Sequence, residues 1–243
     1  IGAVFFKFRP STVHIVPGAS APEWPYASAE TAAATLEEVA LRDNLQKGMT
    51  VVYHRDPNAE GPTVYSFADT LVIDKPVTVR GETGDPADVV INGSGTSGNT
   101  TCTAMVVSKA GAVVEGVTFK NCKAENAGGS VRVTEGTVRN CIFDSCHQAG
   151  NTGCNGSGVY INGSSAVVSN CVIKNCYVGF TGAGDGIGAY ITGGGTLANT
   201  LVTGCYRSSY AHAVDTEGVV YLAKGTVKNC TIAKNAIGRS ALY

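Results

Sequence analysis

Hydrophobic residues in this chain alternate in short bursts and do not follow helical spacing. Residues 138–146 read Val-Arg-Asn-Cys-Ile-Phe-Asp-Ser-Cys, where Val, Cys and Phe alternate with polar residues and Asn and Ser interrupt the run. A period of two, broken by residues that favour turns, predicts short strands joined by tight bends. We expect Val138, Cys141, Phe143 and Cys146 to point into a core.

The same phrase returns at nearly constant intervals. Its Asn recurs in steps of 30, 29 and 30 residues, at Asn140, Asn170, Asn199 and Asn229. A degenerate copy begins at Val114 and has Gly116 in place of Asn. This period predicts a stack of equivalent coils, in which each coil buries its apolar face against its neighbours. Asn and Gly at the bend suit a backbone at positive φ.

Aligning the coils predicts four inward columns. Strands in a parallel stack lie about 4.8 Å apart, so each side chain must pack on its counterpart one coil away. The columns are Val114, Val138, Val168, Leu197, Val227; Val117, Cys141, Cys171, Thr200, Cys230; Phe119, Phe143, Ile173, Val202, Ile232; and Cys122, Cys146, Cys176, Cys205, Asn235.

A second phrase in each coil predicts an outward stripe. Strand alternation turns the flanking aliphatic residues inward and the middle residue outward, which aligns Arg132, Tyr160, Tyr190 and Tyr221. These residues are the candidate ligand-binding set, since tyrosine offers an apolar ring with a polar tip to a sugar or a protein. The alternative is that they pair only with each other across neighbouring strands.

The N-terminal part reads differently. Ser28–Leu41 is the one stretch with helical spacing, and Ser28 suits an N-cap. We expect this helix to cover one end of the stack. The sequence thus predicts a strand, loop and capping helix in residues 1–48 and one continuous repeat domain in residues 49–243.

These residues carry a family resemblance. The stretches 71–81, 88–93 and 110–119, together with the repeated Asn-Cys phrases, resemble bacterial right-handed parallel β-helix proteins of the pectate-lyase-like superfamily. Within it, the chain is similar to surface or secreted β-helices, including passengers of autotransporters and polymorphic outer-membrane proteins. The resemblance implies an all-β, right-handed parallel β-helix (solenoid) in residues 12–243. It implies no single function, because one fold hosts many activities.

Composition narrows the function classes. Charged residues make up 15% of the chain, against about 25% in an average domain, and 18 Lys and Arg balance 19 Asp and Glu. This balance argues against a nucleic-acid partner. No apolar run reaches the roughly 18–20 residues that span a bilayer. We expect no signal peptide in this chain and further coils or domains beyond Tyr243 in a parent protein.

The nine cysteines predict packing more than chemistry. The pairs Cys141/Cys146 and Cys171/Cys176 have four intervening residues, which is not the spacing of a zinc knuckle. Most cysteines fall in the inward columns, where a thiol packs as a small hydrophobe. Cys102 and Cys154 lie outside the columns and are the better disulfide candidates.

The turn loops at 148–158, 178–188 and 206–218 should cluster on one edge. They carry Asp185, Arg207, His212, Asp215 and Glu217, which are candidates for acid, base or Ca²⁺ ligands. No other cofactor or metal is predicted. The aspartate trio and Arg-x-Pro-x-x-Arg phrase of enzymes on this fold are absent.

The sequence therefore favours a non-catalytic scaffold or adhesin, secreted or on a bacterial cell surface, that binds a glycan or a protein partner along its face. The alternative is a polysaccharide lyase or glycoside hydrolase that acts at the loop edge.

Overall fold

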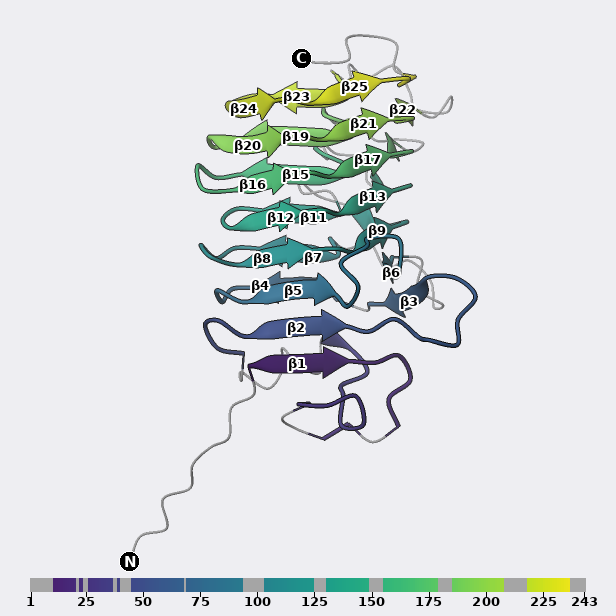
Figure 1. Ribbon diagram of the computed structural model, residues 1–243. Coiled ribbons are helices and arrows are strands. Elements are labelled where there is room, and N and C mark those ends of the chain that lie inside the picture. Colours follow the sequence, from purple (N-terminus) through teal and green to yellow (C-terminus); the bar gives the residue numbers. More distant parts are fainter. Residues whose placement is uncertain are drawn as a thin grey trace, which may run out of the picture.

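The computed structural model shows one elongated stack of β-coils, with chain direction running from the lower to the upper end (Figure 1). It describes residues 11–20, 22–23, 26–36, 39, 45–67, 69–93, 103–124, 130–148, 155–178, 185–207 and 218–236. All strand pairs of the named sheets are parallel. The chain is thus an all-β parallel solenoid, as predicted.

Four sheets form the walls of the stack. The eight-stranded sheet contains β1 (Thr12–Ile15), β2 (Thr50–Tyr53), β5 (Thr78–Gly81), β8 (Val113–Glu115), β12 (Thr137–Arg139), β16 (Val167–Ser169), β20 (Gly195–Ala198) and β24 (Gly225–Lys228). The seven-stranded sheet contains β3 (Thr63–Ser66), β6 (Val89–Asn92), β9 (Thr118–Lys120), β13 (Ile142–Asp144), β17 (Val172–Lys174), β21 (Leu201–Thr203) and β25 (Thr231–Ala233).

The other two walls are shorter. The six-stranded sheet contains β4 (Leu71–Ile73), β7 (Met105–Val107), β11 (Val131–Val133), β15 (Val159–Asn162), β19 (Ala189–Thr192) and β23 (Val220–Leu222). The four-stranded sheet contains β10 (Lys123–Ala124), β14 (His147–Gln148), β18 (Tyr177–Val178) and β22 (Tyr206–Arg207). From β8 upward, a coil visits the eight-, seven-, four- and six-stranded sheets in turn.

The predicted columns form the core in the predicted register. Val138 pairs with Val114 below and Val168 above, and Phe143 pairs with Phe119 and Ile173. All of these side chains are fully buried. The rings of Phe119 and Phe143 stack with centroids 5.5 Å apart and planes 14° apart. Like residues align because only a matching side chain fills the same space one coil away.

Each coil bends where the backbone adopts positive φ. The predicted bend residues have φ between 48° and 65°, at Gly116, Asn140, Asn170, Asn199 and Asn229. A second bend five residues later has φ between 52° and 65°, at Asn121, Ser145, Asn175, Gly204 and Lys234. Asn and Gly dominate both rows because they tolerate the left-handed region best.

The inward residue after the first bend supplies a hydrogen-bond donor to the backbone. The thiol of Cys141 lies 3.3 Å from the carbonyl oxygen of Arg139, and the thiol of Cys171 lies 3.1 Å from that of Ser169. In the next coil the hydroxyl of Thr200 donates to the Ala198 carbonyl at 2.8 Å. Thr therefore replaces Cys because its hydroxyl serves the same buried carbonyl.

The column after the second bend follows the same rule. Cys146 Sγ lies 3.4 Å from the carbonyl oxygen of Phe119 in the coil below. Asn235, which ends this column, donates from Nδ2 to the equivalent carbonyl of Val202 at 3.1 Å. The cysteines are thus small donors that also pack as hydrophobes.

The seven described cysteines are free thiols, and all but Cys230 are buried. Burial raises the pKa of Cys141 and raises that of Cys171 to about 12. These two thiols are therefore protonated and unreactive at neutral pH. Cys102 and Cys154 lie outside the described residues.

Over the described residues 28–35, the capping helix predicted for Ser28–Leu41 is not seen. Residues 28–35 form turns and a bridge between Ala33 and Ile15, and of the remainder only Leu36 and Val39 are described, both helical. The Ala33 N–H donates to His14 O at 3.0 Å, and the Val16 N–H donates to Ala33 O at 2.9 Å. The open backbone of edge strand β1 thus outcompetes local helix propensity.

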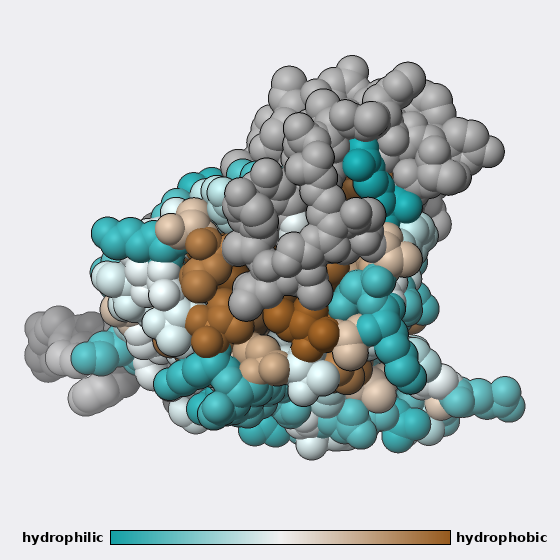
Figure 2. Space-filling view, turned by 90° about the horizontal axis from the view of Figure 1, so that it is seen from above, coloured by the Kyte–Doolittle hydropathy of each residue, from teal (hydrophilic) through white to brown (hydrophobic). Residues whose placement is uncertain are grey.

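This N-terminal segment (residues 26–36) packs on the lower end of the stack. The side chains of Tyr26, Ala33 and Leu36 are buried in the same cluster as Val13 and Ile15 of β1. At the upper end, Figure 2 shows apolar side chains gathered around the axis. The partly buried apolar residues of that last described coil are Leu222, Val227, Cys230 and Ile232.

We expect Phe143→Ala to lower the free energy of unfolding by about 3–5 kcal/mol, because it opens a cavity between two stacked coils. Ile142→Ala is the matched control, since the Ile142 side chain points outward and is only partly buried. Urea denaturation followed by circular dichroism measures both changes. Equal losses in the two variants would contradict the register.

We expect Asn170→Ala to lower the free energy of unfolding by about 1–2 kcal/mol, because alanine is strained in the left-handed region. Asn170→Gly should change it by less than about 1 kcal/mol, since glycine adopts positive φ freely. Asn170 is exposed with φ of 53°, so few contacts change. The same denaturation experiment compares them. A glycine variant as unstable as the alanine variant would contradict this role.

Candidate binding surface: two aromatic ladders

The predicted outward stripe exists as a ladder on the six-stranded sheet. Arg132 pairs with Tyr160, Tyr160 with Tyr190, and Tyr190 with Tyr221, each one coil above the last. The rings of Tyr160 and Tyr190 have centroids 5.4 Å apart, and those of Tyr190 and Tyr221 are 5.0 Å apart. Arg132 Cζ lies 5.7 Å from the Tyr160 centroid, in cation–π range. We call these four residues the first ladder.

The first ladder presents ring edges and hydroxyls, not ring faces. Its neighbouring ring planes differ by only 4° and 6°, so the Tyr190 ring lies face to face with the Tyr160 ring below and the Tyr221 ring above. All four side chains are partly buried. The sequence suggested rings on which sugars could stack, but both faces of Tyr160 and Tyr190 and the lower face of Tyr221 are covered by neighbouring members of the ladder. The ladder can instead hydrogen-bond through a row of phenol oxygens, and its electropositive ring edges favour oxygen-bearing ligands.

A second ladder runs up the four-stranded sheet and was missed in the sequence. Lys123 pairs with His147, His147 with Tyr177, and Tyr177 with Tyr206. The His147 and Tyr177 rings have centroids 4.7 Å apart and planes 3° apart, and Tyr177 and Tyr206 follow at 5.3 Å and 13°. Tyr206 is 39% exposed. A signal was present, because each member directly follows a cysteine of the fourth column.

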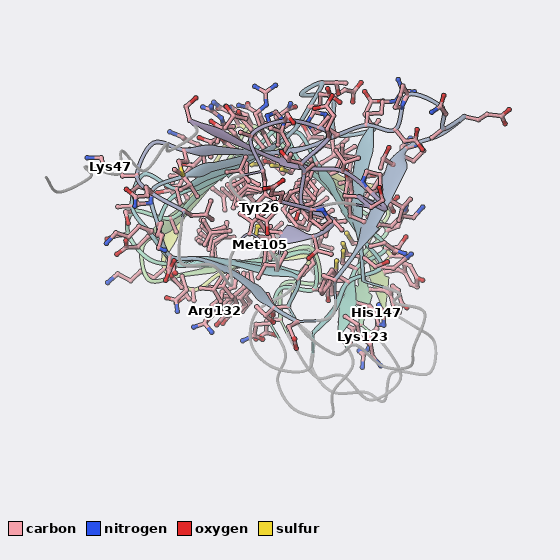
Figure 3. All side chains as sticks on the ribbon, turned by 90° about the horizontal axis from the view of Figure 1, so that it is seen from below. Tyr26, Lys47, Met105, Lys123, Arg132 and His147 are labelled. Atoms are coloured by element: carbon pink, nitrogen blue, oxygen red, sulfur yellow. The ribbon has the colours of Figure 1, made fainter. Side chains whose placement is uncertain are left out.

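Both ladders begin with a basic side chain and continue upward with aromatic rings. Lys123 and Arg132 belong to the same coil, and both are followed by aromatic rings in the coils above. Figure 3, which looks along the stack, shows Arg132 on one wall and Lys123 with His147 on the next, on one side of the molecule. One side of the stack therefore carries two cations at one level and six rings, one of them an imidazole, above them.

Burial is the largest cause of the pKa shifts of three ladder side chains, His147, Tyr177 and Tyr190. Burial, assisted by the Lys123 ammonium, lowers the pKa of His147, so this imidazole is neutral at pH 7. Burial also raises the pKa of Tyr190 and of Tyr177, with neighbouring tyrosines adding to the shift. Buried Nε of Arg132 and Nδ1 of His147 make no hydrogen bond. Burial thus favours the uncharged forms of His147, Tyr177 and Tyr190 at neutral pH.

Of the loop-edge candidates, only Asp185 and Arg207 lie among the described residues. Asp185 N–H donates to Asn155 Oδ1 at 3.0 Å, and the charge of its carboxylate reaches Tyr190 of the first ladder. Arg207 ends β22, and its N–H donates to Ala236 O at 3.2 Å. His212, Asp215 and Glu217 lie outside the described residues. Within the described ranges, no set of three or more His, Cys, Asp or Glu side chains is placed to hold a metal ion.

Comparison with known proteins identifies the fold family. The family model described as "right handed beta helix region" matches residues 103–242, which is more than half of the chain. No curated protein and no solved structure matches. Among the described residues, no helix has the length and apolar character to cross a membrane.

We expect alkaline pH to destabilise the stack through its buried phenols. A tyrosine whose pKa is raised on folding contributes stability below its unfolded pKa of about 10 and loses it as pH rises beyond that value. The double variant Tyr177→Phe/Tyr190→Phe keeps the stacked rings and removes both hydroxyls. Its urea midpoint should fall less than that of the wild type between about pH 8 and about pH 11. Identical falls in both proteins would contradict the burial of these hydroxyls.

Proposed function

We propose that this chain, which belongs to the right-handed β-helix family, is a non-catalytic scaffold that binds a glycan or protein partner along its face. The observation that carries the proposal is the first ladder. Three tyrosines and one arginine stand in register on successive coils. Along the ladder-bearing side, the described residues show no group of three or more His, Cys, Asp or Glu side chains placed to hold a metal ion.

The ladder suits an extended, repeating ligand. Its rungs are fixed by backbone pairing and by ring stacking at 5.0 and 5.4 Å, so few side-chain rotamers remain to be ordered on binding. Such preorganisation lowers the entropic cost of association. A row of phenol hydroxyls can donate to and accept from the hydroxyls of a glycan chain or the backbone of an extended peptide. Arg132 adds a positive charge at the lower end of the first ladder.

The proposed location is the bacterial cell surface or the medium. It is supported by the resemblance of the Asn-Cys repeat phrases to surface β-helices of the pectate-lyase-like superfamily, including autotransporter passengers. The second ladder strengthens the binding role, because it doubles the outward aromatic groups on the same side of the stack.

The test is a glycan array with the wild type and matched triple variants. We expect Tyr160→Phe/Tyr190→Phe/Tyr221→Phe to bind at least roughly tenfold more weakly, because three hydrogen bonds are lost at about 0.5–1.5 kcal/mol each. The corresponding triple alanine variant should lose binding altogether, since the stacked rings that position the ligand are also gone.

The control is Thr137→Ala/Val167→Ala/Thr196→Ala, an outward column of the eight-stranded sheet. Its binding should equal that of the wild type. Unchanged binding by the triple alanine variant would contradict the role of the first ladder. If the wild type binds no glycan on the array, the glycan part of the proposal is wrong.

A further inference from the structure

A chain of three titratable side chains lies at the lower end of the stack, away from the ladders. His14 Nδ1 is 2.7 Å from His54 Nε2, and His54 Nδ1 is 3.0 Å from Glu82 Oε1. The two imidazole centroids are 5.0 Å apart. The three groups come from β1 and from the residues after β2 and β5, so the chain links three successive strands of the eight-stranded sheet.

Hydrogen-bond chemistry fixes the protons in this chain. A carboxylate only accepts, so His54 Nδ1 carries the proton that it donates to Glu82. With no further proton on His54, its Nε2 accepts and His14 Nδ1 is the donor. One proton added to the pair still leaves one donor and one acceptor at this contact. A second added proton would leave two donors facing each other at 2.7 Å, and the contact must then open.

The strand that carries His14 also holds the N-terminal segment. The His14 N–H donates to Tyr26 O at 2.9 Å, and its C=O accepts from the Ala33 N–H at 3.0 Å. On the other side, the Tyr65 hydroxyl shares its one proton between His54 O at 2.7 Å and Ile15 O at 3.1 Å. The imidazole pair is therefore a side-chain link between the end of β2 and β1, the strand to which the N-terminal segment is hydrogen-bonded.

The neighbouring acids offset only part of the cost of protonating the pair, because burial and the charge of His54 lower the pKa of His14 more than Glu82 and Glu30 raise it. Glu82 and Glu30 are the acids that act on His14, and Glu30 is fully exposed. Arg80 donates to Glu82 O at 2.7 Å, which brings another cation close, while Arg55 is occupied by Asp88 at 3.5 Å. Burial first, and then the charge of His54, lowers the pKa of His14.

The stability that His14 contributes should decrease as the pH falls. A histidine whose pKa is lowered on folding binds fewer protons in the folded than in the unfolded state below about pH 6.5. Its contribution to stability is therefore complete above that pH and declines as pH falls.

We propose that His14, His54 and Glu82 form a pH-sensitive latch that holds β1 and the N-terminal segment on the stack at neutral pH and releases them in mild acid. This inference is independent of the proposed binding function. Release would uncover the edge of β2 and the buried side chains of Val51 and Tyr53.

Hydrogen exchange of backbone amides tests the latch on the whole chain. After correction for the intrinsic pH dependence, amides of β1 and Ala33 should exchange about sevenfold faster at about pH 5 than at about pH 7.5. This factor follows if the released state binds one proton about ten times more tightly than the latched state does. Amides of β12 and β13 should keep their protection and serve as the internal reference.

Two variants separate the latch from general acid sensitivity. His14→Gln can still donate to His54 but cannot titrate, so the acceleration at β1 should fall to less than about threefold. His147→Gln on the second ladder should leave it unchanged. An equal acceleration in all coils, or one that persists in His14→Gln, would overturn the proposal. NMR titration of His14 in the wild type gives a second check, and protonation above about pH 6.5 would also overturn it.

Discussion

In-register parallel stacking is the constraint on which the rest of this structure depends. A strand one coil away lies about 4.8 Å distant, so every position along the chain meets its own counterpart. Val138 meets Val114 and Val168, and Phe143 meets Phe119 and Ile173. Mismatched volumes would leave voids that no other element can fill, because the core side chains of each coil pack against those of its neighbours. The sequence repeat is the consequence of this geometry.

The same in-register stacking also aligns the side chains on the outer surface, where it places groups of one kind in a row. An aromatic residue repeated at one outward position becomes a row of face-to-face rings, as in Tyr160, Tyr190 and Tyr221. Stacking then covers the ring faces between neighbouring coils and leaves the ring edges and hydroxyls. Under the proposed binding function, recognition by the two ladders would depend on the spacing of polar groups more than on apolar contact. The spacing is set by the backbone and does not adapt to the ligand.

The architecture could be predicted because the signals for it are local and repeated. Alternation, the Asn bends and the inward columns all follow from residues within one coil, and the bends at Asn140 and Asn170 have the expected backbone. The N-terminal segment could not be predicted in this way. Its helical spacing was outweighed by the open backbone of β1, a partner distant in sequence from Ala33. The second ladder was missed because its strands are only two residues long. The His14–His54 contact joins residues 40 apart and leaves no periodic trace.

The backbone pairing of Ala33 with β1 makes the two ends of the stack different. The lower end is closed by a segment of the chain itself, and each later coil adds its strands to the coil before it. Synthesis from the N-terminus delivers the closed end first and then one coil at a time onto a finished surface. Each new coil can therefore pair with the coil that folded before it, beginning from the closed lower end. Folding of such a molecule can keep pace with the emergence of its chain, with little unpaired β-surface exposed at any moment.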